Sequence, residues 1–151
     1  QQVVARFASA GKKKDRILIN KHIIMSTIKE QLGMYLSKEG LRPEEKPYGF
    51  HFDFEDLSYH VFWDADDPHY LSLTLPGIFD VDENNRDDAL YAANQVNDNM
   101  KVVKTLVRTE DVWVVAEFLI DQTPDFEDLI PRMMNMLKGA RRNFYETIRN
   151  L

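Results

Sequence analysis

Two histidines and an aspartate are the residues whose spacing could support metal chemistry. They lie in two consecutive segments in which large apolar residues alternate with smaller or polar ones, the pattern of β-strands with one buried face. A hairpin turning at residues 55–56 would place His51 opposite His60, with Asp53 two residues along on the same face. Two imidazoles and a carboxylate on a rigid ladder could bind Zn²⁺. The missing fourth ligand favours the alternative, a pair of surface histidines on the outer face of a sheet.

The other residue types form no recognised catalytic arrangement. The chain has no cysteine, so disulfides, thiolate nucleophiles and Cys-based zinc sites are excluded. Its six glycines are scattered, and neither a phosphate-binding loop nor a Gly-x-Ser-x-Gly elbow occurs. Asp64, Asp66 and Asp67 lack the glycine and the terminal glutamate of an EF-hand loop. The sequence therefore predicts a protein that is not an enzyme.

Charge divides the chain into two parts of opposite sign. Residues 1–24 hold six Lys/Arg and one Asp, a net charge of +5, whereas the remaining 127 residues hold 13 Lys/Arg and 24 Asp/Glu, a net charge of −11. An acidic surface repels phosphate, so nucleic acid is a poor partner for the main part. The basic stretch could touch nucleic acid or anionic lipid, and a solvated tail is the simpler interpretation.

Length and hydropathy indicate one compact unit. With 151 residues, of which 44% are hydrophobic, the chain fits a single domain with one core. No apolar run approaches the roughly 18–20 residues that span a bilayer. The absence of cysteine fits a reducing compartment, so we expect a cytoplasmic protein.

Apolar periodicity predicts a single α+β domain over residues 25–151, preceded by a basic extension over residues 1–24. A capping box formed by Thr27 and Glu30 would start the first helix. The predicted order is helix 27–39, strands 48–54, 57–63 and 71–75, a helix from Asn85, strands 102–108 and 112–120, and a helix starting at Thr123-Pro124. Pro76-Gly77 should end the third strand. Short links imply a five-stranded antiparallel sheet with helices mainly on one face.

The last predicted strand is apolar on both faces. Trp113, Val115 and Leu119 occupy its outward positions. An antiparallel sheet with one wet face should alternate instead. We therefore expect its second face to be covered by another chain or by the N-terminal segment.

Methionines gather on the last predicted helix, at Met133, Met134 and Met136. Methionine adapts its shape to varied partners, so these three join the predicted protein-binding residues, with ordinary core filling as the alternative. The basic face of this helix and the acidic sheet region favour oriented association, so we expect a homodimer or a protein partner. A small-molecule sensor with a pocket lined by Tyr59, Trp63 and Trp113 is a further alternative.

One segment carries a family resemblance. Residues 89–97, Ala-Leu-Tyr-Ala-Ala-Asn-Gln-Val-Asn, lead into Lys-Val-Val-Lys at 101–104 and a hydrophobic strand that ends in Glu-Phe-Leu-Ile-Asp at 117–121. Over residues 27–151 the chain resembles the YbjN-like domains, proposed regulators of bacterial sensory transduction whose fold is shared with class I type III secretion chaperones. The resemblance implies a binding module, commonly dimeric, that holds extended or unfolded segments of a partner and needs no cofactor. It also implies that Asn97 caps or turns the chain.

Overall fold

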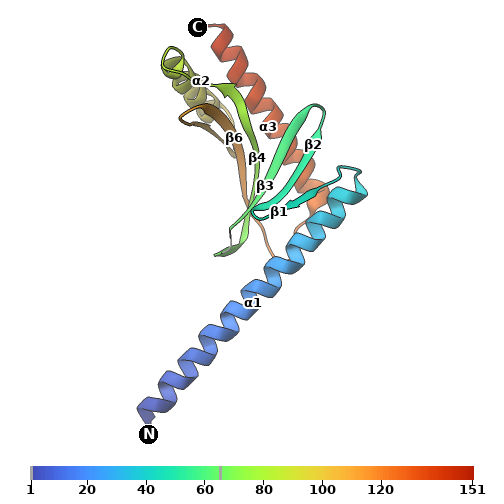
Figure 1. Ribbon diagram of the computed structural model, residues 1–151, viewed down its shortest axis with the longest axis vertical. Coiled ribbons are helices and arrows are strands. Elements are labelled where there is room, and N and C mark those ends of the chain that lie inside the picture. The colour runs from blue at the N-terminus through green and yellow to red at the C-terminus, as the bar shows by residue number, and fades with distance from the viewer. Residues whose placement is uncertain (1, 65) are drawn as a thin grey trace.

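Three helices and six strands make up the part of the chain that the computed structural model describes (Figure 1). Its backbone is described for residues 2–64 and 66–151, and its side chains for residues 13–20, 27–64 and 66–151. The elements are α1 (Gln2–Lys38), β1 (Glu44–Lys46), β2 (Gly49–Phe54), β3 (Leu57–Asp64), β4 (Asp67–Asp80), α2 (Arg86–Asn99), β5 (Val103–Val107), β6 (Asp111–Leu119) and α3 (Phe126–Arg149).

The strands form one antiparallel sheet in the order β1-β2-β3-β4-β6-β5. The β2–β3 hairpin turns at Glu55 and Asp56, whose φ angles are both positive, as in the tight turns that suit strand twist. This turn sets the register that pairs His51 with His60. The predicted hairpin and its register are therefore confirmed.

All three helices bury their apolar stripes against one face of the sheet. Strands β4 and β6 supply alternate residues to the core, such as Leu73 and Val114, and α1 adds the row Ile28, Leu32 and Leu36. Figure 1 shows α3 crossing the sheet and α1 continuing far beyond it toward the N-terminus. The predicted α+β class is confirmed, and the opposite face, here called the outer face, is turned away from the helices.

The sheet has six strands, so the prediction of five was wrong. The additional strand, β1, is a three-residue edge strand, too short and too polar to show an alternating pattern. Nor do Pro76 and Gly77 end β4. Gly77 adopts a φ of +64°, and the register shifts between Leu75 and Phe79 before pairing with β6 resumes. This irregularity bends the strand without ending it.

Two predicted helix starts were also wrong. Helix α1 begins at Gln2, so Thr27 lies inside it and is not its N-cap. The division between an extension and a domain near residue 25 stays a prediction. Helix α3 is capped by Asp125, whose carboxylate accepts the Asp128 amide, and Thr123 lies outside it. None of the helices in the described part of the chain combines the length and hydropathy that crossing a membrane requires.

Asn97 fastens α2 to the edge strand β5. Its side-chain amide donates to the Thr105 carbonyl at 3.2 Å, and its side-chain oxygen accepts the Thr105 amide at 2.7 Å. The side chain thereby imitates a neighbouring strand and satisfies backbone groups of an open edge. The contact is structural, but Asn97 lies inside α2, whose C-cap is Met100, so its side chain does not cap the helix as the family resemblance implied.

Candidate protein-binding face

Five rings form a continuous row across the outer face. Tyr48 and Phe62 stack with centroids 4.8 Å apart, and His51 and His60 lie 4.9 Å apart. Phe62 then continues the row to Trp113, at 6.4 Å. We call Tyr48, His51, His60, Phe62 and Trp113 the aromatic row.

The row bridges the central strand β4. Phe62 lies on β3 and Trp113 on β6, the two strands that flank β4. Between them the small side chains of Ser72 and Thr74 are buried, with 3% and 1% of their surface exposed. The rings of Phe62 and Trp113 thus cover Ser72 and Thr74 in the middle of the sheet, on the face that is turned away from the helices.

Hydrogen bonds hold the histidine end of the row. The Tyr48 hydroxyl lies 2.7 Å from Nδ1 of His60, and Nε2 of His51 lies 3.2 Å from Oδ1 of Asp53. Asp53 also accepts the Ser58 hydroxyl at 2.5 Å, and this bond lowers the pKa of its carboxyl group. Burial, followed by the nearby His51, lowers the pKa of His60. The neutral form of His60 is therefore favoured.

The predicted metal ligands meet on one face but do not form a metal-binding cluster. His51, His60 and Asp53 are neighbours, as their spacing predicted. Nε2 of His51 lies against Oδ1 of Asp53, which also accepts the Ser58 hydroxyl, and Nδ1 of His60 lies against the Tyr48 hydroxyl. Among the side chains that the structure describes, no group of three or more His, Asp or Glu could hold a metal ion. Metal binding stays a prediction, which elemental analysis of the purified protein would test.

Trp113 is fixed at the other end of the row. Its indole nitrogen donates to the Asp111 carboxylate at 2.8 Å, and the Arg108 guanidinium lies 4.5 Å from its ring centroid, a cation–π contact. Val115, two residues along β6, is 7% exposed, whereas Leu119 is 84% exposed. The three outward residues predicted on β6 therefore share one face, and Leu119 is its most open apolar side chain.

The predicted methionines lie on the other side of the sheet. Met133 and Met134 are buried in the core on α3, and Met136 is half-buried against it. They are therefore not brought together with Trp113 or Leu119. Core filling, the alternative interpretation, describes their positions.

The pocket proposed for a small molecule is not formed by the residues predicted for it. Tyr59 stacks on Phe52 inside the core, and burial raises its pKa to about 12. Trp63 packs against the same core, whereas Trp113 lies on the outer face. The sheet separates Trp113 from Tyr59 and Trp63, so the three side chains line no common pocket.

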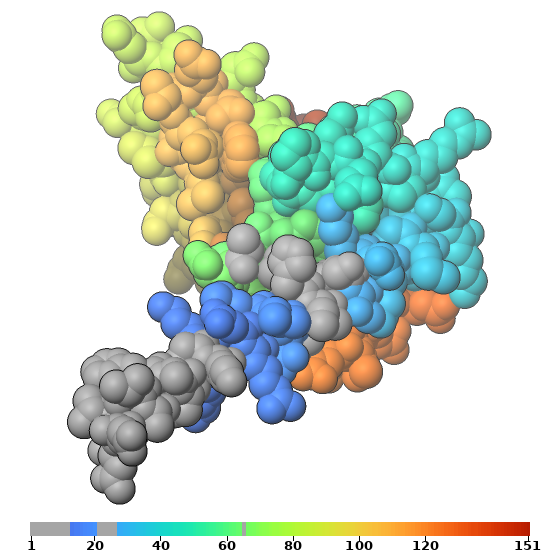
Figure 2. All heavy atoms as spheres, turned by 60° about the horizontal axis from the view of Figure 1, so that its bottom comes forward, coloured from blue at the N-terminus to red at the C-terminus, as the bar shows by residue number. Residues whose placement is uncertain are grey.

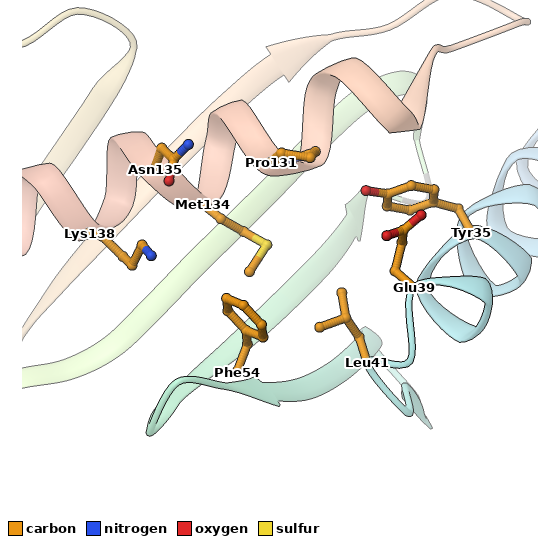
Figure 3. A pocket seen from close by; sticks show the side chains of 8 residues that line it. All are labelled: Tyr35, Glu39, Leu41, Phe54, Pro131, Met134, Asn135 and Lys138. Carbon is orange, nitrogen blue, oxygen red and sulfur yellow. The ribbon is translucent and has the colours of Figure 1, made fainter.

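A different hollow, which the sequence did not predict, lies where α1, α3 and the β2–β3 hairpin meet (Figure 3). It has a volume of about 200 Å³. Figure 3 shows the Met134 thioether pointing into it, with Lys138 at one end and Glu39 at the other. Lys138 is already paired with Glu55 at 2.8 Å. Its residues come from distant segments, so no local pattern announces it. The lining consists of Tyr35, Glu39, Leu41, Phe54, Pro131, Met134, Asn135 and Lys138.

Comparison with known proteins identifies the fold. No family model matches the sequence, and no curated protein matches it either. Among solved structures, YbjN, a proposed transcription regulator from E. coli, is similar with a TM-score of 0.62 and 12% identity, over 80% of this chain and 91% of that one. An uncharacterized protein from Methanothermobacter thermautotrophicus gives 0.60 and 12%, over 80% and 96%. The ExsC–ExsE complex gives 0.52 and 14%, over 78% and 90%.

These likenesses confirm the resemblance at the level of fold. The chain has a YbjN-like fold. Identities of 12–14% carry the architecture alone, because one fold serves many functions.

Proposed function

We propose that this protein is a non-enzymatic binding module, chaperone-like or regulatory, that holds a partner protein on its outer face. The observation that carries the proposal is the aromatic row together with the exposed Leu119. A sheet face that only meets water would place polar side chains at these positions.

The chemistry of the face suits protein recognition. Tyr and Trp are enriched at protein interfaces because they bury much area and lose little side-chain freedom. Trp113 is held by Asp111 and Arg108, so its ring is already oriented before a partner arrives. Charged groups at the edges, such as the Lys104–Glu117 pair at 2.7 Å, supply a polar rim.

The fold supports the same proposal. One of the similar structures is a complex between two proteins, ExsC and ExsE. This likeness supports a protein-binding role for the chain, and the outer face is where its own residues favour that role.

A matched pair of leucine substitutions tests the proposal. Leu119→Asp adds a charge to the outer face, and Leu90→Asp adds the same charge to α2, where Leu90 is 49% exposed. Both side chains are accessible, so both variants should fold. We expect affinity capture from the native host to recover a partner with the wild type and with Leu90→Asp, and to lose it with Leu119→Asp.

Equal recovery with both variants would contradict the outer face as the binding surface. Circular dichroism of both variants confirms that any loss does not come from unfolding.

A further inference from the structure

The N-terminal part of α1 extends beyond the rest of the molecule, and some of its apolar side chains are exposed to water. We call residues 25–151 the body. All described side chains from residue 13 to residue 20 are exposed, and Ile17, Leu18 and Ile19 expose 48%, 57% and 59% of their surface. We call residues 13–20 the arm. Figure 2 shows the arm in blue, at the surface of the face that is turned to the viewer. Three adjacent exposed aliphatic residues indicate a surface that awaits a partner.

The arm cannot reach the outer face of its own chain. Helix α1 is continuous from Gln2 to Lys38, and Ile28 is its first described buried residue. At 1.5 Å per residue, the arm begins roughly 12 Å beyond Ile28 and ends roughly 22 Å beyond it. Figure 1 shows this part of α1 directed away from the sheet. The outer face of the same chain is therefore not available to cover the arm.

Charge argues against pairing of two arms with each other. The arm carries Lys13, Lys14 and Arg16 against a single acid, Asp15. Two arms side by side would bring like charges together, which is destabilising. Residues 25–151 carry a net charge of −11, so the body of a second copy attracts the arm instead.

The outer face offers carboxylates beside its apolar surface. Glu44, Asp53, Asp111 and Glu117 all contact side chains of that face. Two of these carboxylates are paired with cations, Glu44 with Lys46 at 2.7 Å and Glu117 with Lys104 at 2.7 Å. Asp53 and Asp111 accept hydrogen bonds from neutral donors, the Ser58 hydroxyl and the Trp113 indole nitrogen. Their charges are therefore the ones that a basic arm could meet beside the apolar side chains.

We propose that the arm of one copy docks on the outer face of a second copy, with its aliphatic side chains against Leu119. Reciprocal docking closes a symmetric dimer. The inference rests on the proposed function only in that it uses the same face. It also makes the arm a competitor of the partner protein for that face.

Engineered cysteines test the docking cleanly because the chain contains none of its own. Tagged Leu18→Cys protein is mixed with untagged Leu119→Cys protein, and disulfide formation is followed under mild oxidation. In the control, Leu90→Cys protein takes the place of Leu119→Cys protein, since Leu90 is also an exposed leucine, at 49%, but lies away from the face. We expect the 18–119 disulfide to form at least tenfold faster than the 18–90 disulfide.

Light scattering provides the second measurement. The wild type should be a dimer at micromolar concentration, and the double variant Ile17→Asp, Leu18→Asp should be a monomer with an unchanged circular dichroism spectrum for the body. Equal rates for the two disulfides, a dimer that survives the double variant, or a monomeric wild type that instead binds anionic phosphatidylglycerol vesicles would each overturn the inference.

Failure of this inference and failure of the proposed function give different results. If the 18–119 disulfide does not form but Leu119→Asp still loses the captured partner, the outer face binds a partner other than the arm. If neither effect occurs, the outer face is not a binding surface.

Discussion

At the scale of single residues, Gly49 is the position where the fold leaves no room for a side chain. Its φ is +148°, and a Cβ atom built there would lie 2.0 Å from the Val61 carbonyl oxygen. The close approach lets β2 begin beside β3 at the edge of the aromatic row. Only glycine satisfies both the backbone angle and the contact.

We predict that Gly49→Ala lowers the free energy of unfolding by roughly 2–4 kcal/mol, because it adds a backbone clash to a strained φ. Gly40→Ala is the control, since Gly40 also has a positive φ, +77°, but nothing within 4 Å of a built Cβ. It should cost about 1 kcal/mol. Urea unfolding measures both, and equal losses would contradict the role assigned to the Val61 contact.

His60 should make stability depend on pH. Burial lowers its pKa below the ordinary value of 6.5, so the unfolded chain binds a proton more readily than the folded chain. The stability that this group contributes is therefore fully present above pH 6.5 and is lost as the pH falls toward the lowered pKa. We expect the wild type to lose more stability than His60→Phe between pH 7 and pH 5 in urea titrations, and parallel losses would contradict this.

At the scale of elements, α3 works as the main apolar cover of the sheet. Seven of its residues are buried, Met133 and Met134 among them. Its stripe runs the length of the helix even though Pro131 lies inside it. The methionines of α3 therefore act on stability, and any effect on binding follows from that.

We predict that Met133→Ala lowers the free energy of unfolding by about 2–4 kcal/mol, because it leaves a cavity among fully buried neighbours. Met136→Ala, at a half-buried position of the same helix, should cost about 1 kcal/mol or less. Chemical denaturation compares the two. If the two losses were similar, Met133 would not be the core residue described here.

Sequence periodicity predicted the elements that carry their own pattern. Alternation in β2 and β3, together with the two-residue turn, was enough to pair His51 with His60. The helix start predicted from the capping box at Thr27 was wrong, because a local capping signal can also occur inside a longer helix. The Pro76-Gly77 pair misled for a related reason, since a bulge and a strand end use the same residues.

The candidate site was only partly predictable. Because β6 is apolar on both of its faces, its pattern predicted that Trp113, Val115 and Leu119 share the outward face. The contributions of Tyr48 and Phe62 were missed, because the aromatic row depends on which strands flank β4. The methionines of α3 could not be assigned to core or surface before the side of the sheet that α3 covers was known.

At the scale of the whole molecule, the two faces of the sheet differ in their surroundings, and two parts of the chain carry net charges of opposite sign. The helices and one sheet face enclose the core, and the other sheet face carries the aromatic row. The body is acidic and the N-terminal stretch is basic. This polarity gives the molecule an orientation toward partners, and its attraction should weaken as salt is added.

The most direct test of the central claim is photo-crosslinking from the outer face in the native host. A photoreactive amino acid is placed at Leu119, which is 84% exposed on that face, or at Leu90 on α2 as control. We expect discrete protein adducts, either with a partner or with a second copy, from position 119 and far fewer from position 90. The absence of adducts from position 119, or an equal yield from both positions, would contradict it.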